Sequence, residues 1–404
     1  MERVVVVGAG QSGSALVAKL RLEGYTGAVT LIGDEDEPPY QRPPLSKAYL
    51  LGELEKERLY LRPHAFYAEN EIDLVTGTAV TGIDRVGRAI RTEAGDYPYD
   101  ALVLTTGSRA RALPDAIGGA LDGVVTVRSL GDVHVMEPLF REHARVLIIG
   151  GGYIGLEAAA VAAKLGLKVT LIEQEQRILK RVAAPITSEF FRDLHVSHGV
   201  DLREAVGLER LLGEKDTVKA AVLTDGSEIE VDFVVTGIGI HPEDRLAAAA
   251  GLETDRGIVV DRFGRTSDPN IWAAGDCTVF EWRGAPTRLE SVQNAIDQAE
   301  VVAKNLLGAE EPYDPKPWFW SDQFDVKLQI AGLNRGFDQV VVRPGERDGA
   351  VSHWYYGAGE LVAVDAMNDP RAYMVGKRLV DAGRSPDPDQ VADPDVDLKT
   401  LLRG

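Results

Sequence analysis

The chain has 404 residues, of which 45% are hydrophobic and 26% charged, as expected for a globular protein of two or three domains. Its formal net charge of −19 argues against nucleic acid as a general partner. No apolar run approaches the length of a membrane span, and the first residues lead straight into a predicted strand, so we expect a cytoplasmic protein that does not contact membranes.

Residues 3–34 have the pattern of strand, tight turn, helix, strand and acid. Val4 to Val7 is the first predicted strand, Ser14 to Leu22 the helix and Val29 to Ile32 the second strand. The turn is Gly8-Ala9-Gly10-Gln11-Ser12-Gly13, and Asp34 follows its last glycine by about 20 residues, where the acid of a dinucleotide site binds ribose. The alternative is an ordinary strand–helix turn.

The next segment, Pro43-Pro44-Leu45-Ser46-Lys47, is stiffened by its prolines. We expect Ser46 to cap a short helix that follows it. Lys47 is either an ordinary surface lysine or one placed by the rigid Pro-Pro pair. Residues 74–105 alternate as strands do, and a strand over 99–104 ends at Thr105-Thr106-Gly107.

A second nucleotide-binding pattern covers residues 145–173. A strand over 145–149 precedes Gly150-Gly151-Gly152-Tyr153-Ile154-Gly155, and an alanine-rich helix over 156–165 follows. The strand over 168–172 ends at Glu173, at the ribose position. A nucleotide fold that binds no nucleotide is the alternative.

The strand over 231–236 ends at Gly237-Ile238-Gly239 and resembles 102–107, which indicates a repeated module. His195 and His198 lie near a predicted helix end, but no third ligand is apparent, so we predict no metal site.

The last part of the chain contains a short strand over 271–273 followed by Gly275-Asp276, then a helix over 291–307 and a linker over 309–317. Strands over 326–330, 339–342, 351–356 and 361–366 and a helix over 371–381 predict a small antiparallel α+β domain. The acidic, proline-rich tail over 385–397 is expected to be a loose arm or one ordered on contact.

The single cysteine, Cys277, excludes an internal disulfide, a Cys-x-x-Cys pair and an iron–sulfur cluster held by four thiolates of this chain.

Several motifs together resemble the FAD-dependent NADH:ferredoxin reductases of bacterial oxygenase systems, of the putidaredoxin reductase and palustrisredoxin reductase type. The resemblance covers essentially the whole chain. It rests on both glycine motifs, residues 43–47, Gly150 to Glu157, Gly275-Asp276-Cys277, Glu290-Ser291-Val292 and Trp318-Phe319-Trp320-Ser321-Asp322-Gln323.

The resemblance implies an α/β fold of the glutathione reductase type, with two Rossmann-like dinucleotide-binding domains and a C-terminal α+β domain. The FAD-binding domain would be discontinuous, comprising 1–112 and 242–318. The NAD-binding domain would cover 113–241, and the C-terminal domain 319–404.

The resemblance also implies site residues. Those implied for non-covalent FAD are Gly8, Gly10, Ser12, Gly13, Asp34, Arg42, Lys47, Val80, Thr106, Gly107, Arg109, Arg128, Asp276 and Val292. Those implied for NADH are Gly150, Gly152, Tyr153, Ile154, Gly155, Glu173, Gly237 and Gly239. Lys47, Glu157 and Trp320 would lie at the reacting rings as catalytic residues.

The implied activity is hydride transfer from NADH to N5 of FAD, followed by two single-electron transfers to a separate 2Fe-2S ferredoxin that feeds a monooxygenase or dioxygenase. The helix that starts near Ser291 would stabilise negative charge on the reduced flavin. Glu157 either pairs with Lys47 or is a first-turn acid favoured by the helix dipole, and the sequence leaves both open.

The partner surface departs from what an acidic ferredoxin requires, because Gln293, Asp297 and Glu300 form a polar, acidic helix face. Arg62, Lys327 and Arg335 are the candidate docking residues, the complex is expected to be transient, and the reductase is expected to be a monomer. Two other functions remain open: a flavoprotein of the same fold with another acceptor, and an NADH-responsive scaffold like apoptosis-inducing factor.

Overall fold

The computed structural model describes residues 1–403 and divides the chain into two compact units, each built from separate segments. Unit 1 comprises residues 1–41, 55–109 and 240–315, and unit 2 comprises residues 42–54, 110–239 and 316–404. The predicted domain limits at 112, 242 and 318 lie close to the places where the chain passes from one unit to the other, after residues 109, 239 and 315. Residues 42–54, which the sequence assigns to the FAD-binding domain, instead pack with unit 2, where the short helix they form contacts α3 and α4.

Unit 1 is built on a parallel sheet of five strands in the order β19-β7-β1-β2-β3. These strands are β19 (Ile271–Ala273), β7 (Ala101–Leu104), β1 (Arg3–Val7), β2 (Ala28–Ile32) and β3 (Ile72–Val75). Strand β7 is buried along its whole length, as expected for an inner strand of a sheet covered on both faces.

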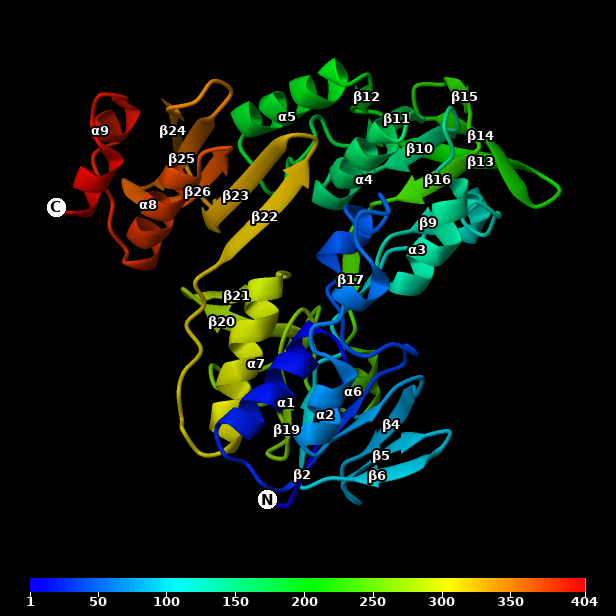
Figure 1. The fold of residues 1–404 in the computed structure, drawn as a ribbon, viewed down its shortest axis with the longest axis vertical. Coiled ribbons are helices and arrows are strands. Elements are labelled where there is room, and N and C mark those ends of the chain that lie inside the picture. Colours follow the sequence, from blue (N-terminus) through cyan, green and yellow to red (C-terminus); the bar gives the residue numbers. More distant parts are fainter. Residues whose placement is uncertain (404) are drawn as a thin grey trace. The chain divides into compact units, whose positions relative to one another are not determined.

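Helix α1 (Gln11–Leu22) starts inside the first glycine motif, three residues before the predicted start, because the turn passes directly into the helix. It lies beside α7 (Val292–Leu306), as Figure 1 shows. Leu16 and Leu20 of α1 and Val302 of α7 are fully buried in one core with the sheet. The hydroxyl of Ser12 donates to the carbonyl of Ala295 at 2.8 Å and joins the two helices.

The rest of unit 1 consists of short elements. They are β4 (Val80–Asp84), β5 (Ala89–Thr92), β6 (Gly95–Pro98), β8 (Ser108–Ala110), β17 (Ile240–Pro242), β18 (Ile258–Val259), β20 (Thr278–Trp282), β21 (Ala285–Thr287), α2 (His64–Glu69), α6 (Arg245–Ala249) and the 3₁₀-helix η2 (Lys56–Arg58).

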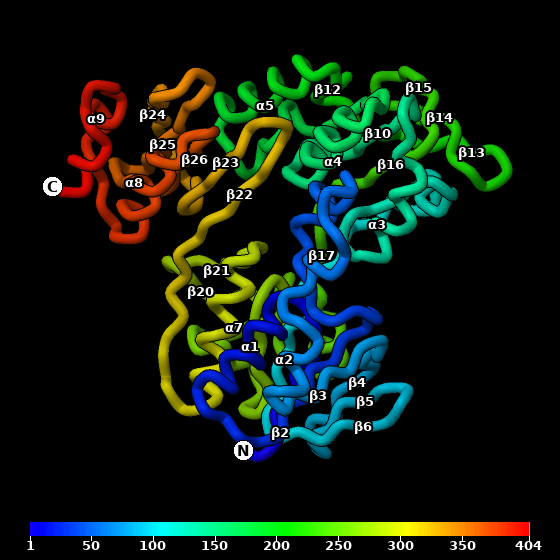
Figure 2. Tube along the Cα trace, viewed as in Figure 1, coloured from blue at the N-terminus to red at the C-terminus, as the bar shows by residue number. Residues whose placement is uncertain are grey.

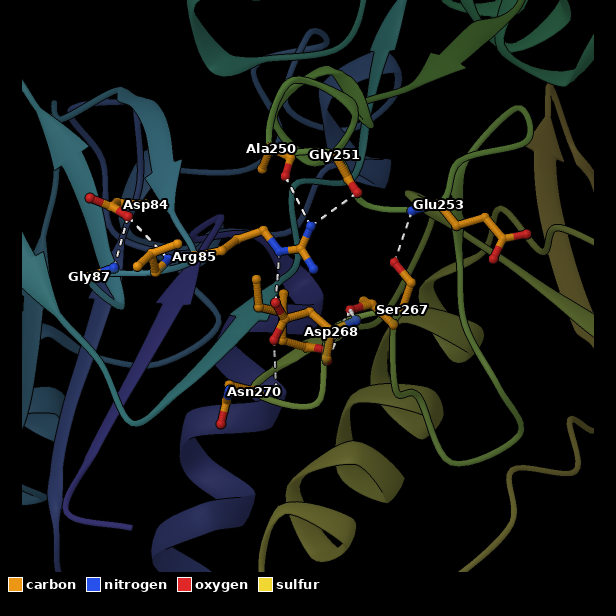
Figure 3. A network of polar contacts seen from close by, with 12 residues as sticks. Asp84, Arg85, Gly87, Ala250, Gly251, Glu253, Ser267, Asp268 and Asn270 are labelled. Atoms are coloured by element: carbon orange, nitrogen blue, oxygen red, sulfur yellow. Dashed lines mark hydrogen bonds and ion pairs between the residues drawn. The ribbon is translucent and has the colours of Figure 1, made fainter.

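Arg85 ties the antiparallel sheet β4-β5-β6 to the rest of unit 1 (Figure 3). Its Nε pairs with Asp268 Oδ2 at 2.7 Å, and its Nη1 donates to the carbonyls of Ala250 and Gly251. Asp268 also accepts from the Asn270 N–H at 2.9 Å, and these contacts hold the pKa of its carboxyl below its usual range against the opposing effect of burial. The network is structural, since Arg85 joins three separate segments of unit 1 through Asp268, Ala250 and Gly251.

Unit 2 contains a second parallel sheet in the order β12-β11-β10-β16-β9, in which β16-β10-β11-β12 repeats the order β7-β1-β2-β3 of unit 1. The predicted repeat is therefore confirmed. Its strands are β12 (Asp201–Glu204), β11 (Lys168–Glu173), β10 (Arg145–Ile149), β16 (Phe233–Thr236) and β9 (Val124–Thr126). The accompanying elements are β13 (Leu208–Glu214), β14 (Thr217–Leu223), β15 (Glu228–Glu230), α3 (Leu130–Met136), α4 (Tyr153–Lys164), α5 (Pro185–Ser197), η1 (Pro43–Ser46), η3 (Asp115–Ile117) and η4 (Glu137–Leu139).

The C-terminal part of unit 2 is an antiparallel sheet in the order β22-β23-β26-β25-β24, with α8 (Pro370–Asp381) packed on it. Its strands are β22 (Trp318–Gln323), β23 (Val326–Gly332), β26 (Glu360–Met367), β25 (Val351–Gly357) and β24 (Gln339–Pro344). Sequence analysis predicts four of these strands and the helix, and misses β22.

The tail over 385–397, expected to be either a loose arm or one ordered on contact, is ordered (red in Figure 2), so the loose-arm alternative is wrong. It forms α9 (Pro388–Ala392) and is followed by the 3₁₀-helix η5 (Leu398–Leu402). Val391, Leu398 and Leu401 are buried in the core of the C-terminal sheet. The buried guanidinium of Arg343 donates to four tail carbonyls, including those of Val391 and Val396. The burial of three apolar side chains and the hydrogen bonds of one arginine therefore keep the tail ordered despite its acidic composition.

Candidate active site

The three glycines of the first motif have different surroundings. Gly8 has φ +112°, and a Cβ there would lie 2.2 Å from the Thr105 carbonyl oxygen. A Cβ on Gly13 would lie 2.2 Å from the Gly8 carbonyl oxygen, where α1 packs on β1. Nothing lies within 4 Å of a Cβ on Gly10. The first and third glycines are thus required by packing, and the second keeps open a space at the start of α1.

The second motif repeats this arrangement in unit 2. Gly150 has φ +109°, with a Cβ position 2.5 Å from the Gly237 carbonyl oxygen, and a Cβ on Gly155 would lie 2.0 Å from the Gly150 carbonyl oxygen. The space around Gly152 is again open. The open space at the middle glycine is thus kept in both copies of the repeated module, which indicates that it has a function.

Helices α1 and α4 begin at these open glycines, and neither Gly10 nor Gly152 provides a side-chain cap. The first-turn N–H groups therefore keep their capacity to bind an anion, and the helix dipole adds positive potential there. An open approach and uncapped N–H groups suit the pyrophosphate of a dinucleotide, so both cradles fit such a ligand.

The ribose acids differ between the two units. Glu173 ends β11, and its carboxylate accepts the N–H of Gly151 at 2.7 Å and that of Glu175 at 2.8 Å. Strand register makes Gly33 the unit 1 residue equivalent to Glu173. Ile32 is paired with Val7, just before the first glycine motif, and Ile172 is paired with Ile149, just before the second. Asp34 follows one residue later and is exposed. The ribose role of Asp34 stays a prediction.

Asp276 follows β19 at the same edge of the unit 1 sheet and accepts the hydroxyl proton of Ser108 at 2.9 Å. Gly107 has φ +68°. Nearby, Thr106 donates to the Glu243 carbonyl oxygen at 2.5 Å, and Arg109 pairs with the Glu243 carboxylate at 3.2 Å. The loop after β7 and the Gly-Asp turn are thus brought together, as a ligand-binding edge of a parallel sheet requires.

Helix α7 begins at Val292, and its cap is Ser291, whose hydroxyl oxygen accepts the Asn294 N–H at 3.1 Å. This cap uses one first-turn N–H group and leaves those of Val292 and Gln293 without a side-chain acceptor. Gln293 donates to Asp297 at 2.5 Å, so part of the predicted acidic face is internally bonded.

Of the other residues implied for FAD, Val80 starts β4 in unit 1 and is half-buried. Arg42 and Arg128 belong to unit 2, where Arg42 donates to the Arg128 carbonyl oxygen at 2.9 Å. Gly237 and Gly239 follow β16, and a Cβ on Gly237 would lie 3.3 Å from the Cα of Gly155.

Lys47 and Glu157 form an ion pair in unit 2, with Nζ 3.0 Å from Oε1. Glu157 lies on the first turns of α4 and is 5% exposed. Its carboxylate also accepts the hydroxyl protons of Ser321 at 2.7 Å and Ser46 at 3.0 Å. Burial raises the pKa of Glu157, and Lys47 is the largest opposing influence. Of the two alternatives for Glu157, the structure shows the ion pair.

Ser46 does not cap a following helix as predicted. It is the last residue of the 3₁₀-helix η1, and its hydroxyl is directed at the Glu157 carboxylate. The rigid Pro43-Pro44 pair starts η1, which places both Ser46 and Lys47 at one acid.

Strand β22 brings aromatic rings to the same place. The Lys47 ammonium lies 5.9 Å from the centre of the Trp320 ring, which itself lies 5.5 Å from the Trp318 ring. The Phe319 ring lies 5.0 Å from that of Tyr153, whose hydroxyl is buried without a partner. Ile154 is 40% exposed. Lys47, Glu157 and Trp320 therefore form one cluster, as the resemblance implies.

The profile of the pyridine nucleotide-disulphide oxidoreductase family matches residues 2–299, and that of the reductase C-terminal domain matches residues 318–402. The chain belongs to the pyridine nucleotide-disulphide oxidoreductase family. This membership confirms the predicted fold class and the prediction of an oxidoreductase that uses FAD and NAD(H).

Three similar proteins support the resemblance to ferredoxin reductases. The rhodocoxin reductase of Rhodococcus erythropolis is 40% identical, over 99% of this chain and 94% of that protein. A ferredoxin reductase structure from Rhodopseudomonas palustris has a TM-score of 0.96 and 41% identity, covering 99% of each chain. The crystal structure of the covalent putidaredoxin reductase–putidaredoxin complex has a TM-score of 0.95 and 38% identity, covering 100% of this chain and 98% of that one.

This oxidoreductase has only one cysteine, although its family is named for disulphide chemistry. Cys277 is fully buried, and its thiol donates to the carbonyls of Ala274 at 3.4 Å and Leu104 at 3.6 Å. Burial raises the pKa of the thiol to about 11, so the nucleophilic thiolate is scarce near neutral pH. An internal dithiol step is therefore excluded.

We expect Cys277→Ser to leave the rates of reduction by NADH and of acceptor reduction unchanged, because a serine hydroxyl can donate to the same two carbonyls. The measurement is stopped-flow flavin reduction together with steady-state turnover. A large loss of rate in protein that still holds a full complement of FAD would show that the thiol has a redox role.

Within residues 1–403, no helix is long and apolar enough to cross a membrane. The same residues contain no group of three or more His, Cys, Asp or Glu side chains that could hold a metal ion. His195 is buried and bonded to Gln323, whereas exposed His198 is bonded to the Leu194 carbonyl.

Sequence reasoning missed the two serine partners of Glu157 and the glutamine that bonds to one of them. Ser46 was expected to cap a helix, and Ser321 and Gln323 had no predicted role, although all three lie in motifs that carry the resemblance. One signal was available, because Ser321 and Gln323 are two residues apart, directly after three aromatic residues, and so share a face if this segment is a strand.

Proposed function

We propose that this protein is an NADH-dependent ferredoxin reductase that passes electrons from NADH through bound FAD to a separate 2Fe-2S ferredoxin of a bacterial oxygenase system. The observation that carries the proposal is the pairing of two dinucleotide cradles with a single, buried cysteine. Electrons received from NADH have no dithiol to reduce within this chain, so they leave to a partner.

The similar proteins support a ferredoxin as that partner. Their names describe reductases of rhodocoxin, ferredoxin and putidaredoxin, and the likeness extends over the C-terminal sheet that carries Trp320. The proposal includes a cytoplasmic location, where NADH is available, and a single chain as the working unit.

Each group of residues has a defined task in the proposal. The Gly10 cradle, Asp276 and the α7 N-terminus hold FAD, and the Gly152 cradle with Glu173 holds NADH. The chemistry that a bound FAD supplies is acceptance of a hydride and release of single electrons. Glu157 keeps the Lys47 ammonium in a fixed position and neutralises its charge.

The docking residues remain part of the proposal. Arg62 lies in unit 1 and packs on the Phe66 ring, 4.5 Å from its centre, whereas Lys327 and Arg335 are exposed in unit 2. Few charge pairs would contribute to docking, so we propose an interaction that salt weakens only moderately.

The test is anaerobic reduction of a purified bacterial 2Fe-2S ferredoxin by NADH, with a quinone and a low-molecular-weight disulfide as competing acceptors. The proposal predicts two ferredoxins reduced per NADH and much slower reduction of the other acceptors. Preferred turnover with the quinone or the disulfide would favour the alternative acceptor. Slow reduction with a long-lived charge-transfer band would favour the scaffold.

We also expect a strong preference for NADH over NADPH. The Glu173 carboxylate would meet the 2′-phosphate of NADPH with like charge, which costs on the order of 1 kcal/mol in water and several where the dielectric is low. Glu173→Ala should bring the kcat/KM values for NADH and NADPH closer together, mainly by weakening the binding of NADH. Glu175→Ala is the matched control, because this exposed acid two residues away pairs with Lys180. Equal kcat/KM for the two cofactors in the unaltered protein would refute the assignment.

A further inference from the structure

A chain of buried hydrogen bonds connects Glu157 to a histidine on another helix of unit 2. Ser321 donates to Glu157 at 2.7 Å, the Gln323 amide nitrogen donates to Ser321 at 3.1 Å, and His195 Nε2 lies 2.9 Å from the Gln323 amide oxygen. His195, Gln323 and Ser321 are completely buried. Helix α5 is thereby linked through β22 to the ion pair between Lys47, the residue after η1, and Glu157 on α4.

The direction of these bonds follows from the surroundings of His195. Its Nδ1 is buried and has no hydrogen-bond partner. A buried N–H without an acceptor costs more than an unpaired lone pair, so the proton belongs on Nε2. Burial also lowers the pKa of His195 to about 4, which keeps the ring neutral at physiological pH. His195 is therefore a fixed donor to Gln323.

A fixed donor at His195 determines the direction of the other hydrogen bonds that lead to Glu157. The Gln323 amide must turn its oxygen towards Nε2, so its NH₂ group points to Ser321. Because the Ser321 oxygen accepts that bond, the Ser321 proton is left for the Glu157 carboxylate. Without His195, the amide can turn over, and Ser321 can donate to Gln323 instead of Glu157.

We propose that His195 is a positioning residue, which acts through Gln323 and Ser321 to keep the Glu157 carboxylate ionised and directed at Lys47. The catalytic consequence rests on the proposed function, since Lys47 and Glu157 matter there for reduction by NADH. The hydrogen-bond arrangement itself does not depend on that function.

The charged and titratable neighbours decide the sign of the pH effect. Lys47 faces Glu157 from the end of η1, Tyr153 lies near it on α4, and Asp322 of β22 lies 3.8 Å from Lys47. His198, the residue that follows α5, is the titratable group that acts on His195. Loss of the Ser321 donor raises the Glu157 pKa, so Glu157 becomes protonated at a higher pH and the active ion pair is lost earlier as pH falls.

The first test needs no catalysis. The full-length FAD protein is labelled with ¹⁵N-histidine, and the ring nitrogens of its seven histidines are observed by NMR from pH 8 to pH 5. His195, assigned by its absence in His195→Gln, should show the neutral Nε2–H form throughout. An Nδ1–H form, or protonation in this range, would overturn the proposal.

The second test is the pH profile of flavin reduction by NADH, measured by stopped flow. His195→Leu should shift the acid limb upwards by roughly one pH unit, the effect of one lost hydrogen bond to a charged group, and should match the unaltered protein at pH 8. His195→Gln keeps an N–H donor and should restore the profile. His198→Leu, at the exposed neighbour, should have no effect.

The outcomes separate this proposal from the proposed function. An equal loss of rate at every pH, or no rescue by His195→Gln, would mean that His195 only supports the fold and would overturn the proposal. If the unaltered protein reduces flavin with NADH but does not reduce ferredoxin, only the proposed acceptor fails. In that case the His195 profiles still confirm or refute the positioning role.

Discussion

Gly10→Val is expected to give a folded, colourless protein. Backbone φ at Gly10 is −99°, which valine tolerates, and its Cβ would meet no protein atom within 4 Å. The side chain would instead occupy the space through which a pyrophosphate reaches the first-turn N–H groups of α1. We expect FAD affinity to fall roughly 1000-fold, or about 4 kcal/mol, with little change in the melting temperature of the FAD-free protein.

Gly152→Val is the matched control in the other cradle. It should leave the protein yellow and remove reduction by NADH, while dithionite still reduces the flavin. Gly8→Ala should behave differently from both, because φ is +112° and the new Cβ would lie 2.2 Å from a carbonyl oxygen, so it should unfold at a lower temperature. A yellow, fully active Gly10→Val protein would show that this cradle does not hold FAD.

Removing Glu157 is expected to slow reduction of the flavin by NADH roughly 100-fold, a typical contribution of one positioned charged group. Glu157→Leu leaves the half-buried Lys47 and two serine hydroxyls without their common acceptor, so it should also destabilise the fold by about 3–5 kcal/mol. The measurements are stopped-flow reduction and the free energy of unfolding in urea.

The double variant Lys47→Met/Glu157→Leu separates these two effects. Two apolar side chains in place of the pair should recover most of the lost stability, because no uncompensated charge remains. Reduction by NADH should stay slow, while FAD content and reduction by dithionite are unchanged. Recovery of fast reduction in the double variant would mean that the pair only stabilises the fold.

Sequence patterns predicted the parts of the fold whose signals are local. Both glycine motifs follow directly on apolar strands and precede helices, so strand, turn and helix could be placed from the period of the pattern and the spacing of the glycines. The two parallel sheets share a strand order because each contains the same strand–helix–strand unit, and such units connect parallel strands with one handedness.

What the sequence did not predict depends on contacts between distant residues. His195, Ser321 and Glu157 come from α5, β22 and α4, and no spacing rule relates them. The sequence left the tail open between a loose arm and one ordered on contact for the same reason, since its composition suggests a loose arm and its order depends on Arg343 in β24. The Lys47–Glu157 pair was one of two alternatives for Glu157 that the sequence left open, and only the structure decides between them.

The interleaved path of the chain has a consequence for biosynthesis. Strand β7 is completely buried in the finished sheet, yet its neighbour β19 begins only at residue 271. A ribosome that adds about 5–20 residues per second makes that neighbour at least roughly eight seconds after β7 has been made. During this time all of 110–239 emerges. The backbone N–H and C=O groups along one edge of the apolar strand β7 stay unpaired in the nascent chain, as a site where chaperones or other strands can bind. Because unit 2 also waits for β22, a prematurely terminated chain that stops before residue 271 completes neither unit.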